Sequence, residues 1–359
     1  MLPPLLELHR RLVECPSVSH QEGAIADLVE GLLHEAGAQV ERIGDNVVAR
    51  AGSGPGLLLN SHLDTVPSTP AWTRDPWQWA QEGDRIYGLG SNDAKASVAG
   101  MMVAFERVLR EGGPASVTLL LVPEEETGGK GMEVAWPELA RRPGAPLAAV
   151  VGEPTGLDLA IAQKGLLILE LIAEGDACHS ANADAQGARN PIRQLARDLV
   201  ALEGIDLGAS HGRLGVTTLQ PTVLAAGERR NMVPPTASAY LDLRTHPGCD
   251  PEELIARVEQ RVEARVRVHS NRLQARECPE DAAIAQAAMA ASPGCRVYGS
   301  RTLSDWAYLT IPAVKIGPGR TERSHTSDEF VLVSELEAGA AFYQRLIREF
   351  ALRAKRTPS

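Results

Sequence analysis

The sequence lacks the features that mark membrane and nucleic-acid-binding proteins. No apolar run approaches the ~20 residues that a membrane-spanning helix requires, and 36 Lys and Arg against 46 Asp and Glu give a formal net charge of −10. A surplus of acids makes nucleic acid or an anionic membrane an unfavourable partner. Leu2–Glu14 has leucines at helical spacing but lacks the charge-then-apolar order of a signal peptide. We therefore expect a cytoplasmic protein.

Cysteine is scarce and unpaired in the sequence. The five cysteines are odd in number, widely spaced and without a Cys-x-x-Cys pair. This pattern supports neither a disulfide framework nor a thiolate zinc site. We expect buried thiols with a packing role only. The five are Cys15, Cys178, Cys249, Cys278 and Cys295.

The length of 359 residues suits two domains. Residues 1–163 and 276–359 alternate strand and helix patterns, which indicates crossover connections and a mixed, mainly parallel sheet. Residues 164–275 follow the order β-α-β-β-α-β of a ferredoxin-like α+β unit. The predicted fold is an α/β domain with this smaller domain inserted into it.

Periodicity, caps and turn residues give the individual elements. The predicted helices are Leu2–Glu14, Ala24–Glu35, Ala94–Glu111, Met132–Leu139, Asn190–Leu202, Asp250–Ala264, Ala282–Ala291 and Glu335–Ala351. The predicted strands are Val47–Ala49, Leu57–Asn60, 117–122, 148–151, Leu166–Ala173, Gly215–Leu224, Thr236–Arg244, Val266–His269 and 313–316.

Four short apolar runs end, within a few residues, in side chains that bind divalent metals. Continuous apolar runs suit strands buried on both faces of a parallel sheet, where ligands bind at the carboxyl ends. Asp93, which precedes a predicted helix, completes the set. Convergent ligands of this kind predict a two-metal hydrolase. The runs lead to His62, to Glu124-Glu125-Glu126, to Glu153 and to His325.

Each candidate ligand also has an ordinary structural explanation. His62 and Asp64 leave the same face of an extended segment, so the carboxylate can orient a metal-bound imidazole; alternatively, His62 is a hydrogen-bonded residue at a strand end. Asp93 can bridge two ions ~3.5–4 Å apart or simply cap the helix. The three glutamates after residue 122 can be a solvated charge run, or one can bind metal while its neighbour remains a free base.

Glu153 and His325 are weaker candidates in isolation. Glu153 lies between Gly152 and Pro154, and it can be an ordinary acidic residue of a surface turn. His325 follows a Gly-Pro-Gly bend and can be an ordinary loop histidine. The other ligands favour a metal-binding role for both residues.

The chain resembles a known family along essentially its whole length: the zinc exopeptidases and deacylases that include acetylornithine deacetylase, succinyl-diaminopimelate desuccinylase, carboxypeptidase G and aminoacylase. Each motif is weak alone, but together they are specific. The motifs are Ser61-His62-Leu63-Asp64-Thr65-Val66-Pro67, Tyr87-Gly88-Leu89-Gly90-Ser91-Asn92-Asp93-Ala94-Lys95, Pro123-Glu124-Glu125-Glu126-Thr127-Gly128, Gly152-Glu153-Pro154-Thr155 and Ser324-His325-Thr326-Ser327-Asp328-Glu329-Phe330.

The resemblance implies a role for each matching residue. One zinc ion would be bound by His62, Asp93 and Glu153. A second would be bound by Asp93, Glu126 and His325, with cobalt as a possible substitute. Asp64 would orient His62, and Glu125 would be the general base that takes a proton from water.

The resemblance also assigns residues of the inserted domain and a substrate-side turn. His179 would reach across a homodimer, formed through the inserted domains, and stabilise the oxyanion in the partner's site; alternatively, it caps a loop. Asn231 and Arg244 would bind the substrate carboxylate, although Arg244 can instead be a structural charge on a strand. Ser304 belongs to a turn expected to face the substrate.

The implied reaction is hydrolysis of the amide bond of a small N-acyl amino acid. We favour N-acetyl-L-ornithine, a step of arginine biosynthesis. The alternatives are N-succinyl-diaminopimelate, acyl-citrulline or acyl-lysine, a dipeptide substrate, or a non-catalytic binding relative, against which the complete ligand set argues. Two departures from the family pattern, Ala96 after Lys95 and a segment without proline after His179, affect the substrate preference but no ligand.

Overall fold

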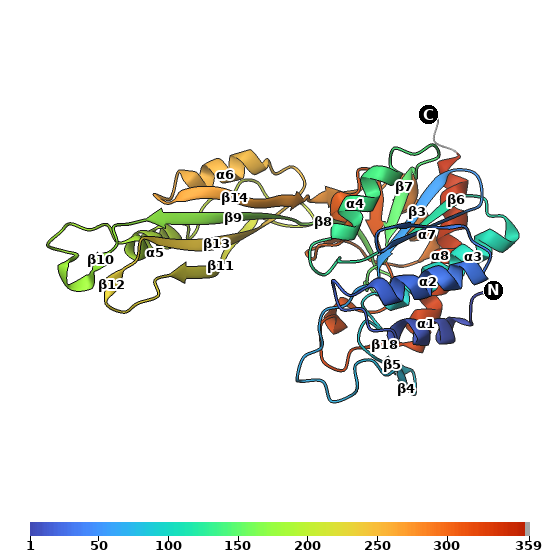
Figure 1. Cartoon of the computed structure of the whole chain (residues 1–359). Coiled ribbons are helices and arrows are strands. Elements are labelled where there is room, and N and C mark those ends of the chain that lie inside the picture. The colour runs from blue at the N-terminus through green and yellow to red at the C-terminus, as the bar shows by residue number, and fades with distance from the viewer. Residues whose placement is uncertain (356–359) are drawn as a thin grey trace. The chain divides into compact units, whose positions relative to one another are not determined.

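The computed structural model describes residues 1–355, which divide into two compact units (Figure 1). Unit 1 comprises Met1–Ile161, Glu277–Tyr298 and the chain from Ser304 onward. Unit 2 comprises Ala162–Arg276 and Gly299–Leu303. The sequence analysis placed Gly299–Leu303 in the larger α/β domain instead. Each unit has its own hydrophobic core.

Unit 1 is built on a mixed sheet that is parallel at its centre. Strands β6, β3, β7 and β17 are neighbours, and the β3–β6, β3–β7 and β7–β17 pairs are parallel. The predicted α/β class is therefore confirmed. In sheet order the strands are β1 (Val40–Ile43), β2 (Asn46–Ala51), β6 (Ser116–Val122), β3 (Gly56–His62), β7 (Ala148–Val151), β17 (Ala313–Lys315), β8 (Leu159–Gln163) and β15 (Arg276–Glu277), with β16 (Val297–Ser300) paired to β8.

The central strands form because their residues are apolar on both faces. All seven residues of β3 and all four of β7 are buried, which requires helices over both faces of a parallel sheet. Helix α3 packs on β3 and β6, and α8 packs on α3 and α7. The helices are α1 (Leu5–Val13), α2 (Gly23–Glu35), α3 (Lys95–Glu111), α4 (Lys130–Leu139), α7 (Ala283–Ala291) and α8 (Val333–Ala354).

The predicted helices are present, with shifts at their ends. The first begins at Leu5 rather than Leu2 because Pro4 occupies the N-cap and holds extended backbone. The sequence pattern did not indicate the three-stranded sheet of β18 (Phe330–Leu332), β5 (Arg85–Tyr87) and β4 (Ala80–Glu82). Strands of three residues are too short to show a period of two.

The five cysteines are free thiols, as predicted. Their predicted burial is correct only for Cys278, whereas the other four are partly exposed. Among residues 1–355, no helix is both long enough and apolar enough to span a membrane.

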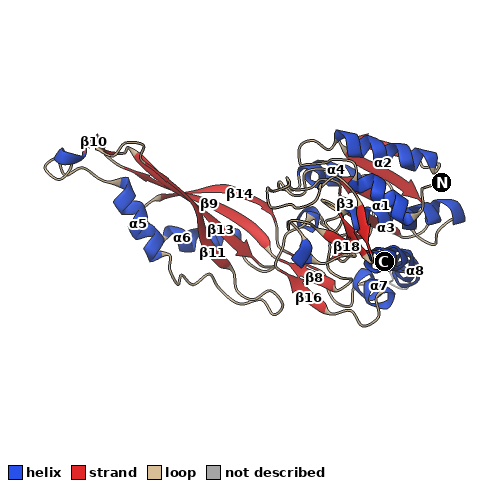
Figure 2. Ribbon diagram, turned by 90° about the horizontal axis from the view of Figure 1, so that it is seen from below, coloured by secondary structure: helices blue, strands red, loops and turns tan. Residues whose placement is uncertain are grey.

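Unit 2 is the predicted ferredoxin-like fold. Four antiparallel strands lie in the order β11-β13-β9-β14, and helices α5 and α6 lie on one side of them (Figure 2). The alternate residues Leu167, Leu169 and Leu171 of β9 are buried in the core of unit 2. The elements are β9 (Gly165–Glu174), α5 (Pro191–Ala201), β11 (Thr218–Ala226), β13 (Thr236–Thr245), α6 (Pro251–Glu259) and β14 (Arg265–Leu273).

Two predicted elements of unit 2 have different bounds. Helix α6 ends at Glu259, five residues before the predicted end at Ala264, because the Asp198 carboxylate accepts the backbone N–H groups of Glu263 and Ala264. Strand β11 begins at Thr218 instead of Gly215, which forms an isolated bridge with His211. The Asn190 and Asp250 side chains cap α5 and α6, and each helix has proline in its first turn.

Candidate metal centre

The candidate ligands lie at the edge of the sheet where the parallel strands end. His62 is the last residue of β3, Glu125 and Glu126 follow β6, Glu153 follows β7, and His325 lies beyond β17. Because β6, β3, β7 and β17 run parallel, their carboxyl ends meet at one edge.

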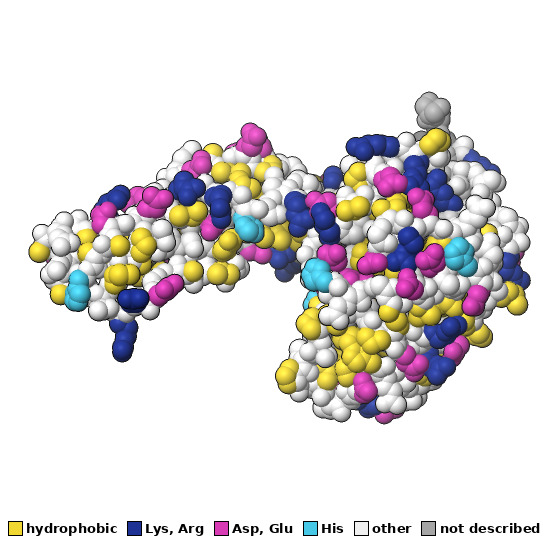
Figure 3. Space-filling model, in the orientation of Figure 1, with side chains coloured by type: hydrophobic (Ala, Val, Ile, Leu, Met, Phe, Trp, Pro, Cys, Tyr) yellow, Lys and Arg dark blue, Asp and Glu magenta, His cyan; other side chains and the backbone are white. Residues whose placement is uncertain are grey.

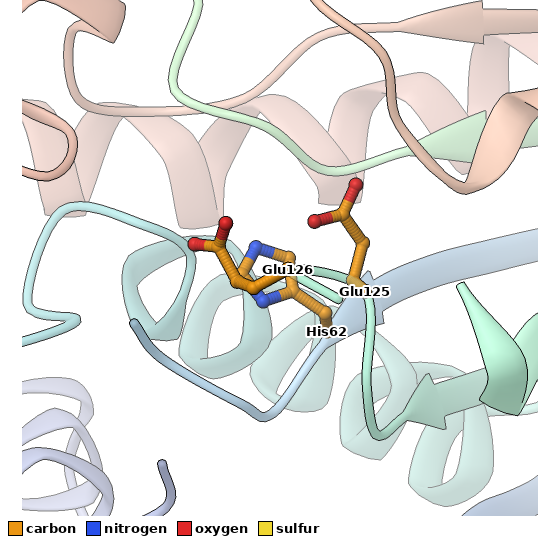
Figure 4. A group of neighbouring side chains, drawn as sticks. All are labelled: His62, Glu125 and Glu126. Carbon is orange, nitrogen blue, oxygen red and sulfur yellow. The ribbon is translucent and has the colours of Figure 1, made fainter. Parts of the chain in front are cut away.

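Among the described residues, the ligand atoms form three overlapping groups, each with its atoms within 4.8 Å of one another. In Figure 4 the Glu126 carboxylate lies beside the imidazole of His62, and the Glu125 carboxylate points to the other side. Asp93 belongs to two groups, as a carboxylate that bridges two ions must. The groups are His62, Asp93 and Glu153; Asp93, Glu126 and His325; and His62, Glu125 and Glu126.

His62 is held with both ring nitrogens directed at specific partners. Its Nδ1 lies 3.0 Å from the backbone oxygen of Asp64 and 3.4 Å from Asp64 Oδ1. Its Nε2 lies 3.2 Å from Asp93 Oδ1. A proton on Nδ1 would therefore leave Nε2 free to bind a cation beside Asp93. His62 and Asp64 are at most 1% exposed.

Two buried carboxylates anchor the loop that carries Glu125 and Glu126. Asp64 accepts backbone N–H bonds from Glu125 and Glu126, each at 3.1 Å. Glu22, which is 2% exposed, accepts one from Glu124 at 3.0 Å. Glu124 has φ of 58°, a strained value for a non-glycine residue of the kind found at functional sites. The loop is therefore fixed through its backbone, and its side chains are left for chemistry.

Asp93 does not cap helix α3. The helix begins at Lys95, its N-cap is Ala94, and no side chain makes a capping hydrogen bond there. This geometry removes the capping explanation for Asp93 and leaves its carboxylate beside His62, with Oδ2 3.9 Å from His325 Nε2.

Glycine brings Glu153 close to the helices behind the sheet. A Cβ atom on Gly152 would lie 2.6 Å from Met101 Cε and 2.9 Å from both Ser97 Cβ and the Tyr343 hydroxyl. Only glycine allows this close approach. The turn after β7 thus positions Glu153 at the sheet edge.

His325 is the most exposed ligand candidate, with 53% of its side chain accessible. Its φ is 60°, and its Nε2 lies 2.9 Å from Glu126 Oε1. This contact raises the pKa of His325 to about 9.

The other charges at this edge are strongly perturbed. Burial and the charge of Asp93 raise the pKa of Glu153 to about 8. Burial and the charge of Glu153 raise the pKa of Glu125 well above its usual value. These shifts show that the carboxylates are crowded where cations would relieve their repulsion. Imidazole nitrogens with carboxylate oxygens are a donor set that suits Zn²⁺, so the residues present fit two divalent ions.

The sequence reasoning missed three buried charged residues near the centre. Asp305 is 1% exposed, and burial raises its pKa to about 7. Burial lowers the pKa of Lys315, which is 2% exposed; a lysine inside the apolar run 313–316 was the signal for it. Glu329 is 2% exposed and accepts the backbone N–H groups of Asn92 and Asp93, contacts that nothing in the sequence pattern reveals.

Two of the residues assigned to the inserted domain are neighbours in unit 2. His179 lies in β10 (Cys178–His179), which pairs with β12 (Met232–Val233), and the backbone oxygen of Asn231 accepts a hydrogen bond from Ser180. His179 is exposed, and its Nδ1 accepts the Ala181 N–H at 3.2 Å. It therefore caps a short 3₁₀ turn, and in the neutral ring the remaining proton must lie on Nε2.

Arg244 lies elsewhere in unit 2. Asn231 precedes β12 and Arg244 is near the end of β13, so roughly 25 Å of strand separates them at ~3.3 Å per residue. The two residues of one chain therefore cannot bind the same carboxylate group. The guanidinium of Arg244 is already paired with Asp242, at 2.8 and 3.0 Å, which agrees with a structural charge on the strand. Ser304, in unit 1, is 3% exposed, and its role with substrate stays a prediction.

Residues 58–349 match the peptidase family M20/M25/M40. The chain belongs to this family. It is 31% identical to a succinyl-diaminopimelate desuccinylase of Methylobacterium sp. (strain 4-46), covering 96% of each protein. It is 26% identical to an acetylornithine deacetylase of Proteus mirabilis (strain HI4320), covering 99% of this chain and 98% of the relative.

A solved M20 structure has the same fold. The YXEP protein of Bacillus subtilis, described as a dinuclear metal-binding peptidase, matches with a TM-score of 0.70 and 15% identity, covering 98% of each chain. Membership in the M20 family makes the present protein a metal-dependent hydrolase. The predicted family and enzyme class are confirmed.

Proposed function

We propose that this protein hydrolyses the amide bond of an N-acyl amino acid at a centre of two divalent cations, with zinc as the native metal and cobalt as a substitute. The observation that carries the proposal is the position of Asp93, which shares one ligand group with His62 and Glu153 and another with Glu126 and His325. A carboxylate common to two groups is what a pair of ions ~3.5–4 Å apart requires.

Glu125 is the proposed general base. When bound, the cations supply Lewis acidity that polarises the amide carbonyl and lowers the pKa of a water molecule. Glu125 neighbours Glu126, and its backbone is fixed by Asp64. With its proton-accepting carboxylate at the ligand groups, Glu125 can take the proton of the attacking water and pass it to the leaving amine.

His179 is the proposed oxyanion donor, provided by a second copy of the chain. Its Nδ1 is engaged by Ala181, so Nε2–H is available to stabilise negative charge, a contribution of about 3 kcal/mol in comparable sites. Asn231, beside His179, would enter the partner's site with it, while Arg244 would act within its own chain.

The proposed homodimer forms through unit 2. Strand β11 is an edge strand with nearly all of its residues exposed, including Val223 and Leu224 at 53% and 64%, and hydrophobic side chains are visible among charged ones on unit 2 (Figure 3). Such an edge can pair with a second copy. Antiparallel pairing of two identical edges is compatible with a two-fold axis, the commonest symmetry of homodimers.

Two substrates lead the proposal: N-acetyl-L-ornithine, as a step of arginine biosynthesis, and N-succinyl-diaminopimelate. Each is supported by a relative of nearly full length named for it, at 26% and 31% identity. Acyl-citrulline, acyl-lysine and dipeptide substrates are secondary candidates.

The test is a substrate and metal panel. Metal-free enzyme is reconstituted with Zn²⁺ or Co²⁺, and kcat/KM is measured on N-acetylornithine, N-succinyl-diaminopimelate, acyl-citrulline, acyl-lysine and dipeptides. We expect two ions per chain by elemental analysis, loss of turnover with chelator, and a clear preference for one acyl amino acid. Chelator-resistant turnover in metal-free protein would exclude the proposed centre, and a preference for dipeptides would exclude the deacylase.

A further inference from the structure

Glu329 connects two ligand-bearing segments that are far apart in the sequence. It follows His325 by four residues and belongs to none of the ligand groups of the described residues. Its Oε1 accepts the backbone N–H groups of Asn92 and Asp93, both at 2.9 Å, and its Oε2 accepts that of Gly90 at 3.1 Å. One buried carboxylate thus holds most of the loop that presents Asp93.

A second contact joins the same two segments. The Asn92 side chain accepts the backbone N–H of Arg320 at 2.8 Å and donates to the Arg320 carbonyl at 3.1 Å. A Cβ atom on Gly319 would lie 2.4 Å from Asn92 Oδ1, so a residue with a side chain does not fit at this position. The Asp93 loop and the segment leading to His325 are therefore tied at both ends.

This tie sets the geometry of one ligand group in particular. Asp93 and His325 are both members of the group completed by Glu126. Neither residue lies in a strand, and the strand pairing that joins their segments, Phe330 with Tyr87, stops short of both. His62 and Glu153, by contrast, are held directly by the ends of β3 and β7. Loss of the tie would alter the spacing between Asp93 and His325 and leave His62 and Glu153 in place.

We infer that Glu329 is a positioning residue that fixes Asp93 relative to His325 and so sets the affinity of the cation shared by Asp93, Glu126 and His325. The inference rests on the proposed two-metal centre. Residues that orient ligands without binding the metal typically contribute 10–100-fold to metal affinity. The neighbouring loop is also held by a buried carboxylate, because Asp64 accepts the backbone N–H groups of Glu125 and Glu126.

The experiment titrates metal-free protein with Co²⁺ and records ion stoichiometry, stepwise affinity and the visible absorption of each bound ion. We compare the wild type with Glu329→Gln and Glu329→Asp. Glutamine keeps one acceptor oxygen and loses the charge, whereas aspartate keeps the charge and loses the reach. We expect both variants to bind one Co²⁺ normally and the other about 10–100-fold more weakly, with an altered spectrum for the weakened ion. Circular dichroism verifies that each variant is folded.

The adjacent acid provides the matched control. Asp328 also accepts backbone N–H groups, those of Thr73 and Arg74 at 3.0 and 3.2 Å, but their loop carries no ligand candidate. Asp328→Asn should leave both affinities and both spectra unchanged.

Four outcomes contradict the inference. If Asp328→Asn weakens one ion as much as Glu329→Gln does, general loosening of the segment explains the effect. If Glu329→Asp behaves as wild type while Glu329→Gln does not, charge alone explains it. If both Glu329 variants behave as wild type while the wild type binds two ions, the inference fails and the proposed centre stands. If the wild type binds one ion only, both fail.

Discussion

At the scale of the residue, two adjacent glutamates are expected to have separate tasks. Glu126 contacts His325 and belongs to a ligand group with Asp93, whereas Glu125 is the proposed base. Glu125→Gln should lower kcat by about 10²–10⁴-fold, because an amide cannot accept the proton of water. Elemental analysis should still find two ions, because Glu126 keeps its carboxylate.

Glu124→Gln is the matched control for this prediction. The Glu124 side chain pairs with His20, 3.2 Å away, and its backbone N–H, which Glu22 accepts, is untouched by the substitution. Its kcat should stay close to that of the wild type. A near-normal kcat in Glu125→Gln would show that the base is another group.

At the scale of the element, helix α5 of unit 2 depends on its cap. The Asn190 side chain accepts the backbone N–H groups of Ile192 and Arg193, at 3.0 and 3.3 Å. Asn190→Ala should lower the free energy of unfolding of unit 2 by about 1 kcal/mol, and Asn190→Ser, which keeps a cap oxygen, by much less. Hydrogen exchange of the α5 and β9 amides reports on unit 2 directly. Equal exchange in all three proteins would contradict the prediction.

The elements that could be predicted are those whose buried residues follow one another in the sequence. The runs at β3, β6 and β7 are buried throughout, so hydrophobicity alone located them and the edge of the sheet where the ligands meet. Short elements such as β4, β5 and β18 carry too few residues for any period. They depend on pairing between distant segments, as Phe330 pairs with Tyr87.

The same limit applies to the candidate site. Ligand types such as His62 and Glu153 could be proposed from position, because a strand end predicts where a side chain will lie. The positioning contacts could not, because Glu329 binds backbone N–H groups, which every sequence offers at almost every residue. The ion pair between Arg244 and Asp242 was not predicted from the sequence either, although both residues are on the same face of β13.

At the scale of the whole molecule, the crowded carboxylates make the metal-free protein sensitive to pH. The pKa values of Glu153 and His325 are raised to about 8 and about 9, so the folded chain holds more protons than the unfolded chain. Stability from such groups is present at low pH and is lost as pH rises through the folded pKa. The melting temperature of metal-free protein should therefore fall between about pH 6.5 and 8.

Bound metal should reverse this trend, because ligands must lose their protons to bind and metal affinity rises with pH. Differential scanning calorimetry with chelator and with Zn²⁺ compares the two forms. Glu153→Gln should flatten the fall in the metal-free protein. A melting temperature that rises over this range without metal would contradict the assignment.

Sharing of active sites between two chains can be tested by mixing inactive variants. His179→Ala retains its own base but cannot provide the donor, and Glu125→Gln provides the donor but lacks the base. With random pairing, half of the dimers are mixed and one of their two sites works, so about a quarter of wild-type activity should return. Each variant must first be shown to be folded and metal-loaded. Mixed dimers without recovered activity would show that His179 does not act in the partner's site.

The position of the ligands along the chain has a consequence for synthesis. His62, Asp93 and Glu153 all precede unit 2, whereas His325 follows it, 325 − 153 = 172 residues later. At about 5–20 residues per second, a ribosome needs roughly 10–30 s to cover that distance. A nascent chain should therefore contain all residues of the first ligand group before it contains His325 of the second, and the two proposed cations should be acquired in sequence, the later one only after the C-terminal segment has folded back onto the sheet.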